Sequence, residues 1–299
     1  MEKMLLTGVS GFLGRNFMER LDKSKYEVYA VGRNCPEFMD TEHFFVHDLK
    51  EFSGMSEYMG KIRPGILVLF AWDVSTQSYW ESLDNCMWAS VCIQTAKAFL
   101  ESGGRQILFA GTSASYDYGK GWLKELPEYE SPSSMYGISK LYASRVLVKL
   151  AADYNALYCE ARLFAIYGKY EKMERLIPLT AWRLSHNEKI VNGCGELVRD
   201  YIYIEDAVNA IHMLIDKKAA GVYNISSGKP VSIGQIILQV AEELGKAELV
   251  EFELCGKSEE FPLIVGDNAK LDKMGFACGY SLQSGVKMAI EWMRKEGKL

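Results

Sequence analysis

The chain has 299 residues, 48% of them hydrophobic, and its formal net charge at pH 7 is -5. This is enough apolar material for one large domain or two coupled ones, and the mild acidity argues against a nucleic-acid partner, because no basic stripe could neutralise phosphates. The longest apolar run, residues 66–72, is too short to span a bilayer, so no membrane partner is expected. The cysteines are scattered along the chain, at Cys35, Cys86, Cys92, Cys159, Cys194, Cys255 and Cys278. They form no CxxC pair and no cluster with the four histidines, which argues against a disulfide framework and against a metal site. Scattered free thiols are typical of a reducing compartment, so we expect a cytoplasmic protein.

Short apolar runs alternate with amphipathic stretches over about the first 165 residues. Strands are expected at 3–8, 26–32, 65–72, 105–112 and 157–168, and helices at 12–23, 82–104 and 135–154. The expected strands show almost no alternation of polar and apolar residues, which predicts a parallel sheet buried on both faces. The sequence therefore predicts an α/β fold with a Rossmann-type, doubly wound parallel sheet.

The pattern changes after Gly168. Loops lengthen, and helices are expected at 232–245 and 285–297. We predict a dinucleotide-binding domain over residues 1–165 and a smaller mixed α/β substrate domain over residues 166–299. Part of the segment 198–226 is expected to pack back on the first domain.

The segment "TGVSGFLG" places Gly8, Gly11 and Gly14 between the first expected strand and the first expected helix. Glycines there let the chain turn tightly and bring a pyrophosphate against the helix N-terminus, whose N–H groups and dipole favour anions. The spacing is GxxGxxG rather than the common GxGxxG, and a purely structural turn is the alternative. Its place at the start of an α/β pattern favours dinucleotide binding.

The second expected strand is followed by Arg33 rather than by an acidic residue. In NAD-binding folds an Asp or Glu near this point binds the ribose hydroxyls, whereas an arginine pairs with the 2′-phosphate of NADP. We therefore expect NADP, with NAD possible. The alternative is that Arg33 is a solvated surface charge and that Asp48 or another acid contacts the ribose.

Tyr136 precedes Lys140 by four residues in an expected helix. Residues i and i+4 of a helix lie on the same face, and a neighbouring ammonium lowers the pKa of a phenol from its usual value of about 10. Such a phenol is a general acid or base for an alcohol and ketone pair. The alternative is an ordinary surface pair. A second copy of the spacing, Tyr116 to Lys120, lies in an expected loop, where the two side chains would not stack.

A hydroxyl residue that could act together with Tyr136 and Lys140 ends the expected strand 105–112. Thr112 and Ser113 stand at its carboxyl end, the usual place for functional groups in an open parallel sheet. The 24 residues from Thr112 to Tyr136 leave room for one loop and the entry to the next helix. A hydroxyl at Thr112 could therefore bind the same substrate oxygen as the phenol.

The glycine loop, Thr112 and the Tyr136/Lys140 pair, in this order, resemble the extended short-chain dehydrogenase/reductase family. The second half resembles its NAD-dependent epimerase/dehydratase branch, which acts on nucleotide sugars: "RLFAIYG" is similar to "RxFNxYGP", "GCGELVRDYIYIEDAVNAI" to "GxGxxxRDFxYVxD", and "GVYNISSG" to "xxYNIGSG". The resemblance spans residues 3 to about 230. One position departs from it, because the asparagine of "RxFNxYGP" is Ala165 here.

The resemblance implies a role for each matching position. Tyr136 would be the acid/base, Lys140 would bind the nicotinamide ribose, and Thr112 would orient the substrate oxygen, with Ser113 as the fallback. Arg199 would pair with the diphosphate of a nucleoside-diphosphate sugar. From its position in the chain, rather than from the resemblance, we expect Trp72 to border the sugar. The cofactor contacts would be Gly8, Gly11, Phe12, Leu13, Gly14, Arg33, Asp48, Leu49 and Ala71, together with Tyr136 and Lys140.

The resemblance also narrows the reaction. In the family's 4,6-dehydratases two acidic residues follow the threonine, and here Ser113 and Ala114 occupy their positions. The cysteine and histidine that the family's keto-sugar epimerases use are also missing. This leaves an NADPH-dependent reductase of a nucleotide-linked 4-keto-6-deoxy sugar, which we favour, and an NAD-dependent nucleotide-sugar 4-epimerase. A non-catalytic dinucleotide-binding sensor is the alternative from another class.

The family often dimerises through two helices of each subunit. The corresponding segments here are 82–102 and 135–154, which carry apolar residues on more than one face. A homodimer is therefore expected, although burial within one monomer would produce a similar pattern.

Overall fold

The computed structural model describes residues 1–75, 77–193, 195–253 and 261–299, so Cys194 and Cys255 lie outside the described residues. The described chain divides into two compact units. The first comprises residues 1–117, 126–162 and 211–223, and the second comprises residues 118–125, 163–210 and 224–299. Most of the chain up to Arg162 thus lies in the first unit. Residues 118–125 belong to the second unit and residues 211–223 return to the first, so the two units are not separated at a single point in the chain.

A seven-stranded sheet organises the first unit, in the order β11-β7-β5-β4-β1-β2-β3. The pairings of β1 with β2 and β4, of β2 with β3, and of β4 with β5 are all parallel. The sheet is of the doubly wound α/β type, which confirms the predicted fold class. Its strands are β1 (Glu2–Thr7), β2 (Tyr26–Gly32), β3 (Phe44–Val46), β4 (Ile66–Leu69), β5 (Gln106–Thr112), β7 (Leu157–Leu163) and β11 (Gly221–Ile225).

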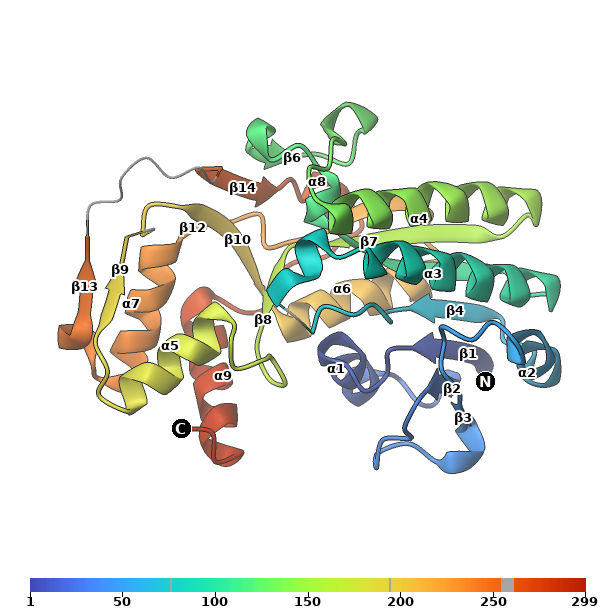
Figure 1. Cartoon of the computed structure of the whole chain (residues 1–299), viewed down its shortest axis with the longest axis horizontal. Coiled ribbons are helices and arrows are strands. Elements are labelled where there is room, and N and C mark those ends of the chain that lie inside the picture. Colours follow the sequence, from blue (N-terminus) through green and yellow to red (C-terminus); the bar gives the residue numbers. More distant parts are fainter. Residues whose placement is uncertain (76, 194, 254–260) are drawn as a thin grey trace. The chain divides into compact units, whose positions relative to one another are not determined.

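The central strands are buried on both faces, as their continuous apolar runs predicted. All seven residues of β5 and all four of β4 are buried. Helices of the first unit cover the sheet, and α3 and α4 run side by side (Figure 1). These helices are α1 (Phe12–Arg20), α2 (Met55–Ile62), α3 (Asp84–Glu101) and α4 (Met135–Asp153), with short 3₁₀ turns η1 (Thr41–His43), η2 (Gln77–Glu81), η3 (Ser113–Ser115) and η5 (Pro127–Tyr129).

The strand order reverses direction between β1 and β4. Such a reversal leaves a crevice at the carboxyl ends of the strands, because the loops that follow the two strands run to opposite sides. The hydroxyl of Thr7, at the end of β1, accepts the N–H of Ala71 at 3.2 Å, which joins the loop after β4 to the first strand. The glycine loop and Ala71 therefore meet at this switch point.

The structure differs from the expected single strand at 157–168. β7 ends at Leu163, and a separate strand, β8 (Ala165–Tyr167), pairs in parallel with β10 (Val198–Tyr203) in another sheet. Phe164 lies between them and donates its N–H to the carbonyl of Ile225 at 3.1 Å. The sequence pattern does not reveal such a change of partner, because β7 and β8 follow each other with only Phe164 between them and no turn residue marks the break.

The second unit is a mixed α/β structure built on its own sheet, in the order β12-β10-β14-β6, with β8 paired to β10. Helix α7 begins at a capping box of Ser232 and Gln235 and ends at Gly245, whose φ is +66°. The strands are β6 (Trp122–Leu123), β12 (Pro230–Ser232) and β14 (Leu263–Gly266), with β9 (Ile190–Asn192) and β13 (Val250–Phe252) as a separate pair. The helices are α5 (Leu176–Ser185), α7 (Ile233–Leu244), α8 (Ala269–Asp272) and α9 (Leu282–Lys295), with η4 (Tyr118–Lys120) and η6 (Ala247–Leu249); α6 (Ile204–Asp216) runs from this unit into the first.

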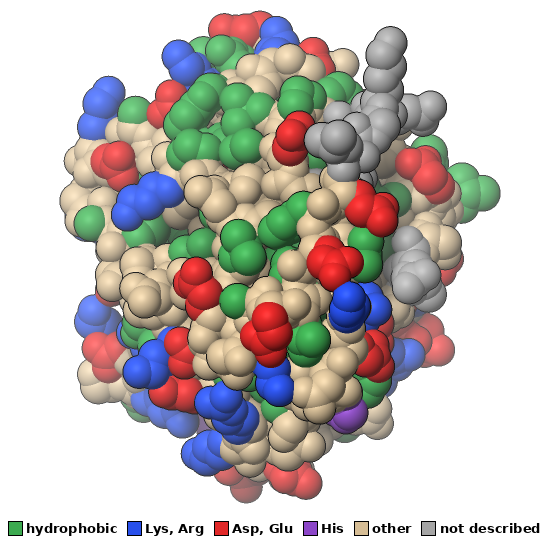
Figure 2. Space-filling view, turned by 90° about the vertical axis from the view of Figure 1, so that its left-hand side faces the viewer, with side chains coloured by type: hydrophobic (Ala, Val, Ile, Leu, Met, Phe, Trp, Pro, Cys, Tyr) green, Lys and Arg blue, Asp and Glu red, His purple; other side chains and the backbone are tan. Residues whose placement is uncertain are grey.

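The surface of the second unit mixes apolar and charged side chains. Figure 2 shows hydrophobic side chains among lysine, arginine, aspartate and glutamate side chains on one face of the molecule. Exposed large hydrophobic residues lie on α5, β9, α7 and β13; they are Leu179, Trp182, Val191, Leu238 and Phe252. Within the described ranges, no helix is long and apolar enough to cross a membrane.

Candidate active site

Neighbouring backbone crowds two of the three glycines at the turn from β1 into α1, Gly8 in the loop and Gly14 in the first turn of the helix. Gly8 has a φ of +75°, which L side chains rarely adopt, and a Cβ added there would lie 2.7 Å from the backbone nitrogen of Ala71. A Cβ on Gly14 would overlap the carbonyl oxygen of Gly8. The glycines therefore let α1 begin directly against the ends of β1 and β4.

The N-terminus of α1 suits a diphosphate. Gly11 is the N-cap residue, no side chain caps the helix, and its first turn carries no acidic residue. The first N–H groups of a helix have no partner within it, and together with the helix dipole they favour an anion. Phe12 and Leu13 supply the first two of these groups. The close approach that the glycines permit and these donors fit the pyrophosphate of a dinucleotide cofactor.

Arg33 directly follows β2, and its side chain is exposed. Within residues 1–75, 77–193, 195–253 and 261–299, no hydrogen bond or ion pair engages its guanidinium. The end of β3 lies alongside, since His47 donates its N–H to the carbonyl of Gly32 at 2.9 Å. The next residue, Asp48, accepts the N–H of Lys50 at 3.0 Å, and Leu49 is buried. The structure thus places an exposed cation and a turn-forming acid close together at the ends of β2 and β3.

The hydroxyl of Thr112 caps the turn that follows β5. Thr112 ends β5, is buried, and its Oγ1 accepts the N–H of Ala114 at 3.2 Å as the N-cap of η3. Ser113 is half-buried in η3. The Thr112 hydroxyl is therefore fixed in direction as an acceptor and keeps its own hydrogen for another partner.

The start of α4 lies unusually close to η3. Ser134 is the N-cap of α4 and accepts the N–H of Gly137 at 3.1 Å. A Cβ on Gly137 would overlap the carbonyl oxygen of Ala114. Sequence reasoning did not single out Gly137, although its position directly after Tyr136 was a usable signal. Its missing side chain brings the Tyr136 turn of the helix against the end of β5.

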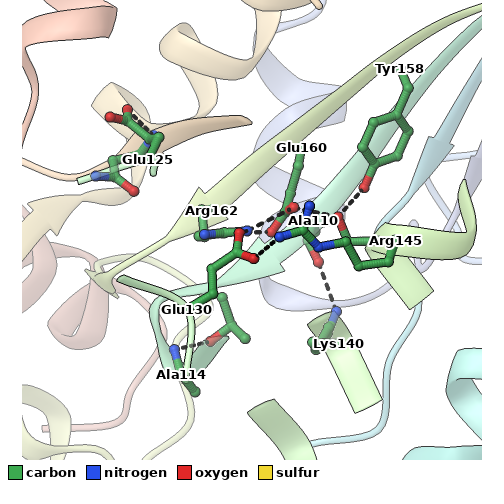
Figure 3. Close-up of polar contacts among 12 residues, drawn as sticks. Ala110, Ala114, Glu125, Glu130, Lys140, Arg145, Tyr158, Glu160 and Arg162 are labelled. Carbon is green, nitrogen blue, oxygen red and sulfur yellow. Dashed lines mark hydrogen bonds and ion pairs between the residues drawn. The ribbon is translucent and has the colours of Figure 1, made fainter. Parts of the chain in front are cut away.

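Lys140 is buried one turn further along α4, with 4% of its surface exposed. Its Nζ donates to the carbonyl of Ala110 in β5 at 2.8 Å, as Figure 3 shows. Burial lowers the pKa of Lys140 to about 8, and the Cys92 thiol and the Glu160 carboxylate oppose that shift. The ammonium is thus bound to the carbonyl of the residue two positions before Thr112, in an environment of low polarity.

Aromatic rings surround the half-buried ring of Tyr136. Trp72, Tyr79 and Trp80 each meet it edge to face, at centroid separations of 6.1, 5.2 and 5.5 Å. The ammonium of Lys140 lies 5.9 Å from its centroid. The structure therefore brings Trp72, Tyr136 and Lys140 together. It adds Tyr79 and Trp80, which sequence reasoning missed although these two aromatic residues follow Trp72 closely in the chain.

Tyr116, from the second Tyr-x-x-x-Lys copy, has a different setting. Its ring is buried, and the guanidinium of Arg162 lies 4.5 Å from its centroid. Tyr116 belongs to the segment that follows β5, and its ring packs on Arg162 in the interior of the first unit.

Arg162 is the centre of a buried polar network between β7 and α4 (Figure 3). Its Nε donates to Oε1 of Glu160 at 2.8 Å, and its Nη2 donates to Oε1 of Glu130 at 2.8 Å. Ser144 of α4 donates to Oε2 of Glu160 at 2.5 Å, and Tyr158 donates to Ser144 at 2.9 Å. Burial alone would lower the pKa of Arg162, but the adjacent carboxylates keep it charged. The network joins β7, α4 and the loop that leads into α4.

In the second unit, Arg199 lies on β10 and is half-buried. Its Nη1 donates to the carbonyls of Val198 at 2.9 Å and Phe261 at 3.0 Å. The next residue, Asp200, is buried and accepts the N–H groups of Ser227, Gly228 and Gly266. Asp200 thereby fixes the strand that carries Arg199, a role that sequence reasoning did not assign. A pairing of Arg199 with a diphosphate remains a prediction.

As for metal binding, the described part of the chain contains no group of three or more His, Cys, Asp or Glu residues that could hold an ion.

Comparison with known proteins gives both a family and a fold. The model of the NAD dependent epimerase/dehydratase family matches residues 4–226. UDP-glucose 4-epimerase from Thermotoga maritima, solved with UDP-glucose, is 23% identical with a TM-score of 0.82, covering 98% of this chain and 99% of that one. UDP-glucose 4-epimerase from Thermus thermophilus, solved with NAD, is 21% identical with a TM-score of 0.83 and the same coverage. dTDP-glucose 4,6-dehydratase from Bacillus anthracis, solved with NAD, is 19% identical with a TM-score of 0.82, covering 99% and 97%.

Proposed function

The chain belongs to the NAD dependent epimerase/dehydratase family, an enzyme family, and we propose that it interconverts a ketone and a hydroxyl at C4 of a nucleotide-linked sugar. The observation that carries this proposal is the pair on α4: Tyr136 stands one turn before a buried ammonium that Ala110 fixes at the carboxyl end of β5. When bound, the nicotinamide dinucleotide supplies the hydride. The glycine loop and the α1 N-terminus would hold its pyrophosphate.

In this mechanism Tyr136 moves the proton. Its phenol gives a proton to the ketone oxygen as that oxygen becomes a hydroxyl, and it takes the proton back in the reverse direction. Thr112, whose hydroxyl hydrogen is not used by Ala114, would orient the same oxygen, with Ser113 as the alternative donor. Lys140 would bind the nicotinamide ribose and favour the phenolate.

We propose a nucleoside-diphosphate sugar as the substrate. Arg199 offers a guanidinium suited to a diphosphate, and Trp72 and its aromatic neighbours offer apolar surface beside Tyr136. The solved structures similar to this chain include one with UDP-glucose, which supports the same substrate class.

Our preferred reaction is the reduction of a 4-keto-6-deoxy sugar by NADPH. The exposed Arg33 after β2 supports it, because a guanidinium in that place can pair with the 2′-phosphate that distinguishes NADPH from NADH. The absence of acids after Thr112 in the sequence counts against dehydration.

A charge change at Arg33 tests the cofactor preference. We expect Arg33→Ala to weaken NADPH binding by about 10-fold or more while it changes NADH binding little, because only NADPH loses a charge-assisted contact. Fluorescence titration gives both dissociation constants. Arg63→Ala is the matched control. Arg63 is also exposed, but it precedes β4 and therefore lies at the edge of the parallel sheet opposite to Arg33. Equal weakening of both cofactors, or no change, would count against NADP.

The second candidate is a nucleotide-sugar 4-epimerase that retains NAD, which the similar 4-epimerase structures favour. Cofactor analysis separates the two. A reductase should purify largely empty and consume one NADPH for each keto sugar it reduces. An epimerase should purify with bound NAD and interconvert C4 epimers without net consumption of cofactor.

We also propose a homodimer formed through α3 and α4. The exposed hydrophobic residues at the start of these helices support it; they are Leu83, Met87, Ile138 and Tyr142. We expect sedimentation at twice the chain mass, and a double variant Ile138→Glu/Tyr142→Glu should sediment as a monomer with an unchanged circular dichroism spectrum. A wild-type protein that sediments as a monomer at micromolar concentration would end this proposal.

A further inference from the structure

The Lys140 ammonium has an aromatic partner in addition to Ala110. Its Nζ lies 4.0 Å from the ring centroid of Trp72, closer than the 4.9 Å to Phe109 or the 5.9 Å to Tyr136. A cation this close to the face of an indole is attracted by the ring quadrupole, most strongly where water is excluded. Trp72 therefore makes the nearest ring contact to an ammonium that is almost completely buried.

The indole ring is also held at its edge, through its nitrogen. Its Nε1 donates to Oδ1 of Asn85 at 2.8 Å. Asn85 is 2% exposed, and its Nδ2 donates to the carbonyls of Tyr79 at 2.6 Å and Ser82 at 2.8 Å. Both amide hydrogens and the amide oxygen of Asn85 are thus engaged, which fixes the direction in which it can accept from the indole.

We propose that Trp72 is a positioning residue of the active site, which holds the Lys140 ammonium through its ring face while Asn85 fixes the ring. The inference deepens the proposed function, since it rests on Lys140 being part of that site. An ammonium has three hydrogens, and Ala110 takes one of them. The ring offers a second attraction without a competing hydrogen-bond acceptor, so the remaining donor capacity stays available for a cofactor hydroxyl.

The electrostatic surroundings explain why such a partner matters. Burial lowers the pKa of Lys140 to about 8. Among the described residues, the titratable groups that face it are the Cys92 thiol from α3, the Glu160 carboxylate from β7 and the Tyr136 phenol from its own helix, whereas β5 contributes an uncharged carbonyl. The ring of Trp72 favours the charged form, so its removal should lower the pKa further. As the pH rises, Lys140 of the variant would then lose its positive charge at a lower pH than Lys140 of the wild type does.

The first test measures Lys140 itself in the protein without added cofactor. Lysine side-chain amino groups are titrated by NMR, and the Lys140 signal is assigned with Lys140→Met. We expect Trp72→Leu to lower the titration midpoint of Lys140 by about one pH unit. Trp72→Phe, which keeps a weaker ring face and loses the Asn85 hydrogen bond, should lower it by a smaller amount. This conservative variant keeps the test decisive if Trp72→Leu does not fold.

Trp80→Leu is the matched control for this titration. Trp80 comes from the same segment and contacts Tyr136, but its indole makes no contact with Lys140 among the described residues. Its removal should leave the Lys140 midpoint within about 0.3 pH unit of wild type. A Lys140 midpoint that does not move in either Trp72 variant, or that moves equally in Trp80→Leu, overturns the proposal.

The second test separates this inference from the proposed function. If Lys140 serves the reaction, the high-pH limb of kcat/KM in Trp72→Leu should move to lower pH by the same amount as the NMR midpoint, with activity retained at lower pH. A loss of activity equal at every pH would indicate a general structural effect and would contradict the positioning role. If the NMR midpoint moves but neither activity nor cofactor affinity responds, Trp72 still positions Lys140, and the proposed function fails instead.

Discussion

Tyr136→Phe is expected to reduce kcat by about 10²- to 10⁴-fold while cofactor affinity stays within about threefold of wild type. The substitution removes only the phenolic oxygen. The ring remains, and with it the edge-to-face contacts to Trp72, Tyr79 and Trp80 that hold it in place. A loss of turnover without a loss of binding is what a group that moves a proton in the transition state should show.

The measurement is a comparison of steady-state turnover with cofactor titration on the same preparation. Tyr142→Phe is the matched control, because Tyr142 lies on the same helix, is 59% exposed in the single chain, and keeps in Phe the ring that the proposed dimer contact uses; the change should leave kcat within about twofold. If Tyr136→Phe kept full turnover, another group would have to move the proton. If the chain were a dinucleotide-binding sensor, the substitution would leave both affinity and biological effect intact.

Arg162→Met is expected to lower the free energy of unfolding by about 3–5 kcal/mol. The substitution removes a guanidinium that is 1% exposed and leaves the carboxylates of Glu160 and Glu130 without their buried partner. Uncompensated buried charge is among the most costly local defects in a folded protein, which is why the effect should exceed that of ordinary core substitutions.

Chemical denaturation followed by circular dichroism measures this change. The control is Arg145→Met, which removes the second arginine on Glu130 but from an exposed position, 56% accessible; it should cost less than about 1 kcal/mol. The double variant Arg162→Met/Glu160→Gln should recover part of the loss, since it also removes one unpaired charge. Equal costs for the two arginines would show that the buried network does not stabilise the first unit.

Much of the first unit follows from local sequence pattern. The apolar runs that became β4 and β5 are buried on both faces, as is β1 from Met4 on, and a run of that kind predicts a parallel strand from neighbouring residues alone. The four-residue spacing of Tyr136 and Lys140 is likewise a property of one helix. The expected strand at 157–168 shows the limit, because its break at Phe164 depends on which sheet each half joins.

By itself, the sequence determined the fold class, the glycine turn after the first strand, and the helix that carries the Tyr136/Lys140 pair, because each depends on residues close together in the chain. Only the tertiary structure decided what surrounds Lys140. The Ala110 carbonyl, the Trp72 ring and the Glu160 carboxylate come from three other segments. Their approach depends on Gly137 packing against Ala114 and on the strand order of the sheet. Contacts between distant segments leave no periodic trace in any one of them, so the electrostatic setting of the site emerges only when the strands and helices pack.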